Sequence, residues 1–120
     1  MKNQVRKSNT QRINDLKAQG CKVFIKHHRV ISRASFENDR PKIVNEIYPI
    51  TEIQEHNWSF EDKSLFWFIE AKGGETYIRV ENKDTGEILT KTRLVCSSKD
   101  NYNKAKALNI CLGRIEKQLN

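Results

Sequence analysis

The carboxy-terminal half of the chain constrains the fold most strongly, because three strand-like runs are separated there by turn signals. The runs cover residues 65–71, 76–82 and 87–96. Gly73-Gly74 separates the first two, and Lys83-Asp84-Thr85-Gly86 separates the last two. Turns of this composition are typical of hairpins between antiparallel strands. We therefore predict a three-stranded antiparallel meander, with the apolar run 65–69 in a central strand that is covered on both faces.

An amphipathic helix is predicted to follow the meander. Ser97 is placed to cap this helix, with Asp100 three residues later completing a capping box. Apolar residues then recur at spacings of three and four, as they do along one face of a helix. They are Tyr102, Ala105, Leu108, Leu112, Ile115 and Leu119. The prediction is an α+β fold in which the carboxy-terminal helix packs across one face of an antiparallel sheet.

The amino-terminal half gives weaker signals. Residues 9–18 have only Ile13 and Leu16 as an apolar face, so we expect a short, weakly anchored helix there. Residues 22–31 are rich in β-branched side chains and predict a strand. Residues 42–53 have strand-like composition, but Pro49 cannot donate to a sheet ladder and favours an edge or a bend.

The polar segments 32–41 and 54–64 are expected to be loops. A chain of 120 residues is long enough for one compact domain. We expect a single domain over residues 1–120, with residues 1–20 as a basic segment that is loosely attached.

The positive charge is concentrated at the amino terminus. The net charge is +7, and residues 1–40 hold ten Lys or Arg against three acids, whereas the remaining eighty residues hold twelve of each sign. Such asymmetry favours an anionic partner such as a nucleotide or a nucleic acid, although a basic tail that only stays solvated remains an alternative.

Composition argues against several other classes of protein. No run approaches the roughly 18 apolar residues of a membrane span, and the amino terminus lacks the apolar core of a signal peptide. We expect a cytoplasmic protein without a membrane partner. Cys21, Cys96 and Cys111 are odd in number and widely spaced, so reduced thiols are expected and neither a metal nor another cofactor is predicted.

The predicted carboxy-terminal helix has a second face that differs from an ordinary solvated surface. At about 100° per residue, six residues gather opposite the apolar stripe. They are Asn103, Lys106, Ile110, Gly113, Arg114 and Lys117. A glycine inside a helix costs on the order of 1 kcal/mol relative to alanine, so Gly113 indicates a close approach by another helix or a flat ligand. Basic residues near a helix end also need no ligand, and a solvated face is the alternative.

The run "KHHR" at residues 26–29 is a second candidate site. In an extended strand His27 and His28 point to opposite sides, so they are not expected to chelate one metal. Arg29 could grip a phosphate with His28 beside it, or the run could be an ordinary charged strand face. No nucleophile, base and orienting partner are spaced as a catalytic set, so we do not expect an enzyme.

Several short motifs together resemble a group of small phage and prophage proteins. They are V-x-I-K-H-H-R at 23–29, K-G-G-x-T at 72–76, C-S-x-x-D-N-Y-N-K at 96–104 and I-C-L-G-R at 110–114. The group has a V-x-V-R-H-Y-R strand, a G-G-x-T hairpin and a helix of the type C-S-x-x-D-x-F-N-R-K-x-G-R-x-I-A-x-G-R. It resembles the Thoeris anti-defence proteins, which sequester the cyclic ADP-ribose type signal made by bacterial TIR enzymes.

This resemblance covers residues 22–31 and 64–119, and it implies a homo-oligomer in the host cytoplasm that binds a nucleotide signal without converting it. The matched positions are Arg29, Tyr102, Asn103 and Arg114, with His28 beside the first. The sequence departs from the group at Ala107 and Leu108, where the group has Gly-Arg. Lys106 could replace the missing cation.

Two other interpretations of the function remain open. A sheet followed by a helix with lysines near its amino terminus also resembles the end of a double-stranded RNA-binding domain, although the leading helix of that domain is not visible before residue 64. The basic amino-terminal third could instead block a host protein.

Overall fold

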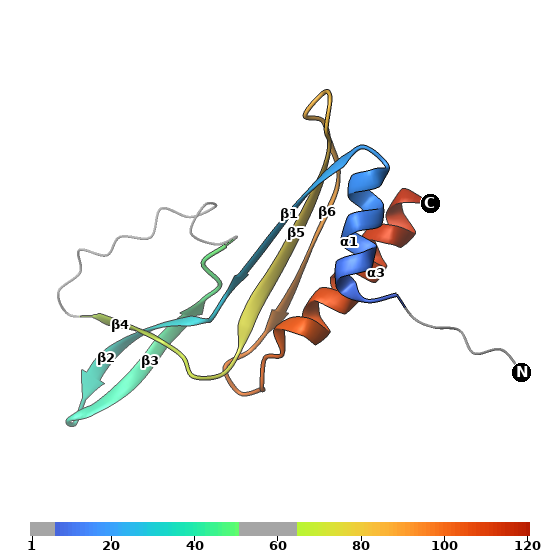
Figure 1. The fold of residues 1–120 in the computed structure, drawn as a ribbon. Helices are drawn as coiled ribbons and strands as arrows, with labels where there is room; N and C mark the ends of the chain where they lie inside the picture. Colours follow the sequence, from blue (N-terminus) through green and yellow to red (C-terminus); the bar gives the residue numbers. More distant parts are fainter. Residues whose placement is uncertain (1–6, 51–64) are drawn as a thin grey trace, which may run out of the picture. The chain divides into compact units, whose positions relative to one another are not determined.

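The computed structural model describes residues 7–50 and 65–120 (Figure 1). Within these residues, the helices and strands follow the order α1(Asn9–Ala18), β1(Cys21–His28), β2(Ile31–Glu37), β3(Arg40–Ile47), β4(Phe66–Ile69), β5(Gly74–Asn82), β6(Ile88–Cys96) and α3(Lys104–Leu119). The predicted α+β class is confirmed. The loop predicted at 54–64 and residues 51–53 of the preceding strand lie outside the described residues. Among the described helices, none has the length and apolarity that crossing a membrane requires.

The chain forms two compact units, each of which draws on separate parts of the sequence. Unit 1 consists of residues 1–25, 77–93 and 103–120, and unit 2 consists of residues 26–76 and 94–102. Each strand of the sheet with order β1-β5-β6 has residues in both units, whereas the sheet with order β3-β2-β4 lies in unit 2.

The hairpin predicted at residues 83–86 connects β5 to β6. The Asn82 side chain accepts hydrogen bonds from the backbone N–H groups of Asp84 and Thr85, at 2.9 and 3.1 Å. Gly86 has a φ of +75°, a conformation that glycine adopts without a steric penalty. The central strand of this sheet is β5, and its Ile78 and Val80 are fully buried.

The first strand of the predicted meander pairs elsewhere. β4 pairs with β2, with Ile31 opposite Ile69 and Ala34 opposite Phe66, and it lies at the edge of its sheet. The prediction of a central strand covered on both faces was therefore wrong, and Ile69 is 62 % exposed. Beyond the end of β4, the Glu70 N–H donates to the Val30 carbonyl at 2.9 Å, and the Glu70 carboxylate accepts from Ser32 Oγ at 2.5 Å.

The predicted loop at 32–41 was also wrong. These residues form β2 and the start of β3, joined by a two-residue turn in which Asn38 and Asp39 have φ of 53° and 62°. Asn and Asp tolerate this left-handed conformation, which matches the twist of paired strands. Because of its polar composition the segment was predicted as one loop, and the Asn38-Asp39 turn between two strands was not recognised.

Helix α3 begins later than predicted. Asn103 is its N-cap, and the Asn103 side chain accepts a hydrogen bond from the Lys106 N–H at 3.0 Å. Ser97 and Asp100 form a separate turn instead of the predicted capping box. The buried face of α3 contains Ala107, Cys111, Leu112 and Ile115, so Leu112 and Ile115 were predicted correctly while Ala105 is exposed.

Helix α1 packs against α3 within unit 1. Its Leu16 is buried, and the guanidinium group of Arg12 contacts the Glu116 carboxylate through Nε at 3.1 Å and Nη2 at 2.5 Å. Arg12 also reaches the Asn109 side chain at 2.5 Å. A Cβ placed at Gly113 would lie 3.7 Å from Nη2 of Arg12, which is ordinary van der Waals contact with the end of a side chain, so the close backbone approach predicted at this glycine is not observed.

Candidate functional site

The six residues predicted to bind a ligand are divided between the two units. In unit 2, Arg29 donates to the Ala71 carbonyl at 2.6 Å, and His28 Nδ1 lies 2.6 Å from the Arg29 carbonyl. In unit 1, Arg114 is exposed and donates to the Arg93 carbonyl at 3.0 Å, while Lys106 is exposed on the first turn of α3. Asn103 caps that helix and Tyr102 belongs to unit 2.

Tyr102 takes part in a partly buried hydrogen-bond network within unit 2. Its hydroxyl lies 2.8 Å from His27 Nδ1, contacts Thr76 Oγ1, and donates to the Glu75 carbonyl at 3.0 Å. His27 Nδ1 also lies 2.9 Å from Thr76 Oγ1. The network holds the segment before α3 against the start of β5. The sequence analysis predicted a role for His28 and not for His27. Strand alternation places the two side chains on opposite faces of β1, but it does not identify the face that contacts Tyr102.

Tyr102→Phe is expected to lower the free energy of unfolding by about 1–3 kcal/mol, because buried polar partners lose one of their hydrogen bonds. Urea denaturation measures the loss. Tyr77→Phe is the matched control, since Tyr77 is half-buried on the same strand as Thr76. Equal stabilities for wild type and the Tyr102 variant would contradict a structural role for this hydroxyl.

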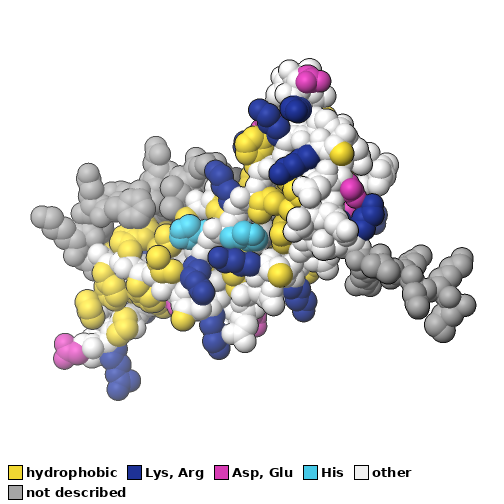
Figure 2. Space-filling model, viewed as in Figure 1, with side chains coloured by type: hydrophobic (Ala, Val, Ile, Leu, Met, Phe, Trp, Pro, Cys, Tyr) yellow, Lys and Arg dark blue, Asp and Glu magenta, His cyan; other side chains and the backbone are white. Residues whose placement is uncertain are grey.

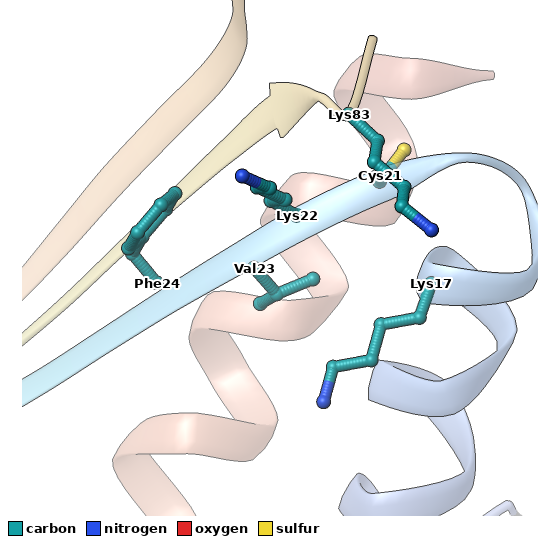
Figure 3. A pocket seen from close by; sticks show the side chains of 6 residues that line it. All are labelled: Lys17, Cys21, Lys22, Val23, Phe24 and Lys83. Carbon is teal, nitrogen blue, oxygen red and sulfur yellow. The ribbon is translucent and has the colours of Figure 1, made fainter. Parts of the chain in front are cut away.

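Unit 1 contains a cavity of about 380 Å³ that the sequence did not predict (Figure 3). It lies where the end of α1, the start of β1 and the β5–β6 turn meet. Gly20, with a φ of +89°, turns the chain from α1 into β1, and the Gly20 carbonyl accepts a hydrogen bond from the Lys83 N–H at 2.9 Å. This bond places Lys83 beside residues of α1 and β1 that are distant from it in the sequence. The lining residues are Lys17, Cys21, Lys22, Val23, Phe24 and Lys83.

The cavity combines positive charge with an aromatic ring. Lys17, Lys22 and Lys83 are exposed, and no acidic residue is among the described residues that line the cavity. Figure 3 shows Lys22 and Phe24 leaving β1 on the same side, with the Lys22 side chain extended toward the ring. The guanidinium carbon of Arg79 lies 4.5 Å from the centre of the Phe24 ring, and Arg79 Nε forms an ion pair with Glu81 Oε2 at 2.7 Å. Such a surface can attract an anion that carries a flat apolar group.

The described residues give little support for catalysis or metal binding at this place. The lining offers no carboxylate or imidazole to move a proton. No group of three metal-binding side chains occurs in the described part of the chain. Elsewhere, burial raises the pKa of the Cys111 thiol, and burial together with the Asp100 carboxylate raises the pKa of Cys96, so neither is activated as a thiolate.

Comparisons with known proteins identify no relative. No family model matches the chain, and neither a curated protein nor a solved structure is similar to it.

Proposed function

We propose that this chain binds a small phosphate-bearing nucleotide without converting it, and that it acts as a phage-encoded anti-defence protein in the cytoplasm of a bacterial host. Its ligand would be a cyclic nucleotide immune signal, either a cyclic ADP-ribose isomer or a small cyclic oligonucleotide. The observation that carries the proposal is the cavity of unit 1, whose described lining residues include three lysines and Phe24 but no acid.

Each part of such a ligand has a matching group in the cavity. Lysine ammonium groups bind phosphate as strong point charges. Phe24 offers an apolar surface for the base, and a volume of about 380 Å³ lies within the range of small-molecule sites. A protein that sequesters a signal needs binding groups only. This proposal moves the site from the α3 face favoured by the resemblance to the junction of α1 and β1.

The test is titration calorimetry of the full chain with cyclic ADP-ribose isomers and cyclic di- and trinucleotides. We expect one ligand to bind and to be recovered unchanged after heating. Lys22→Ala and Lys83→Ala are each expected to weaken its binding about 10-fold or more, because charge-assisted hydrogen bonds contribute about 1.5–3 kcal/mol. Lys91→Ala is the matched control, since Lys91 is an exposed lysine on β6 of the same unit.

The same titrations decide between the two locations of the site. If Arg29→Ala or Arg114→Ala abolishes binding while the lysine variants bind normally, the ligand occupies the site predicted from the resemblance. Binding that none of these variants alters, or conversion of the nucleotide, would contradict the proposal.

Recognition of double-stranded RNA is the second candidate. Lys104 and Lys106 are exposed on the first turn of α3, where the helix dipole also favours phosphate. Binding of this kind weakens steeply with salt, because counterions are released from the RNA backbone. Tight, strongly salt-dependent binding of duplex RNA, without a response to any cyclic nucleotide, would favour this alternative.

A further inference from the structure

An exposed apolar surface covers the β2–β3 hairpin of unit 2. Phe36 is 71 % exposed, Val44 is 50 % exposed and Ile43 is 45 % exposed. Phe36 stacks on Phe66 of β4 with a centroid distance of 4.6 Å, and Phe66 stacks on Phe68 at 5.9 Å. Figure 2 shows hydrophobic side chains gathered over this hairpin. We call Phe36, Ile43, Val44, Phe66 and Phe68 the hairpin patch.

The hairpin patch differs from an ordinary strand surface. Ala34 is fully buried and lies opposite Phe66 in the register, whereas Phe36, two residues further along β2, is largely exposed. Large contiguous apolar patches are rare on soluble monomers and mark surfaces of interaction. Aromatic side chains are also enriched in the buried centres of protein interfaces.

The charges beside the hairpin patch indicate which partner covers it. At the tip of the hairpin, Glu37 forms an ion pair with Lys42 at 3.1 Å, and Asp39 lies next to Arg40. The tip therefore holds two acids and two bases, although the chain as a whole carries a net charge of +7. A contact related by two-fold symmetry requires a surface that is complementary to itself, and a balanced rim around an apolar centre meets this condition. A polyanion or an anionic membrane would select cations alone.

The hairpin favours contact through its face over contact through its edge. β3 is an edge strand, but Pro41 near its start has no N–H to donate to a further strand. The register between β2 and β3 also shifts between Arg33 and Ala34, and such a bulge bends an edge away from further pairing. Two hairpins can still bury their aromatic faces against each other.

We propose that two copies of this chain associate through the hairpin patch, face to face about a two-fold axis. The partner is a second copy of the same chain, and the association is independent of the nucleotide site in unit 1. It places the contact on unit 2, whereas the sequence had suggested the exposed face of α3.

Sedimentation equilibrium of the full chain tests this association. We expect the mass of a dimer at micromolar concentration, and Phe36→Asp is expected to weaken self-association at least 100-fold. Ile88→Asp is the matched control, because Ile88 is 51 % exposed in unit 1 and should not affect the mass. Circular dichroism verifies that each variant folds. If Phe36→Asp does not fold, Val44→Asp replaces it in the experiment.

Two results would overturn the proposal. One is a wild-type chain that stays monomeric at all accessible concentrations. A monomeric chain that binds phosphatidylserine vesicles through Phe36 would be such a result. The other is a dimer that the folded Phe36 and Val44 variants form as readily as wild type. Because these measurements need no nucleotide, their failure would leave the calorimetric test of the lysine cavity unaffected.

Discussion

Leu112→Ala is expected to lower the free energy of unfolding by about 2–5 kcal/mol, which is a large share of the stability of a small domain. Leu112 is fully buried on α3, between Cys111 and Ile115, which are buried as well. Removal of its side chain loses apolar burial and leaves a cavity that the rigid helix cannot close. Urea denaturation followed by circular dichroism measures the change.

Ile110→Ala is the control for this prediction. Ile110 lies on the same helix and is 40 % exposed, so its replacement is expected to cost less than about 1 kcal/mol. Similar losses for the two variants would contradict the two-sided description of α3. A small loss at Leu112 alone would mean that the helix is not packed as the structure has it.

Gly74→Ala is expected to destabilise the protein by about 1–3 kcal/mol through steric overlap. A Cβ at this position would lie 2.8 Å from Tyr102 Cγ and 2.6 Å from Tyr102 Cε2. The ring cannot easily move away, because the Tyr102 hydroxyl is bonded to His27, Thr76 and the Glu75 carbonyl. The loss is measured as a shift of the urea midpoint at constant slope.

A double-mutant cycle separates this overlap from other effects of the substitution. In a Tyr102→Ala background, Gly74→Ala should cost almost nothing, because the clashing ring is absent. Gly86→Ala is a second control: nothing lies within 4 Å of its added Cβ, so only the φ of +75° opposes it, at about 1 kcal/mol. An unchanged cost of Gly74→Ala in the absence of the ring would contradict the steric explanation.

Features set by residues close in sequence were predicted well. The β5–β6 hairpin depends on the Asn82–Gly86 turn, and the burial of Leu112 and Ile115 follows from helical spacing. The pairing of β4 with β2 could not be predicted in this way, because it joins residues that are distant in the sequence, such as Ile31 and Ile69. The start of α3 was misplaced because both Ser97 and Asn103 are residue types that cap helices.

The candidate site was harder to predict than the fold. Lys17, Lys22 and Phe24 belong to the basic first third that the charge analysis singled out, so part of the signal was visible. Lys83 joins them only through the bond of its N–H to the Gly20 carbonyl, and no periodic pattern encodes that contact. The ligand roles of Arg29 and Arg114, which came from the resemblance, remain predictions that the calorimetry addresses.

The packing of α1 against α3 determines which changes to the basic amino terminus are informative. Deleting residues 1–20 would remove far more than charge, because Arg12 leaves the side of Gly113 and the carboxylate of Glu116, and Leu16 leaves the interior. A loss of activity in such a truncated chain would then reflect the missing contacts between α1 and α3. Charge reversal at single exposed lysines leaves the contacts between α1 and α3 in place. A purification tag should be placed before Ser8, because the capping box of α1 begins at that residue.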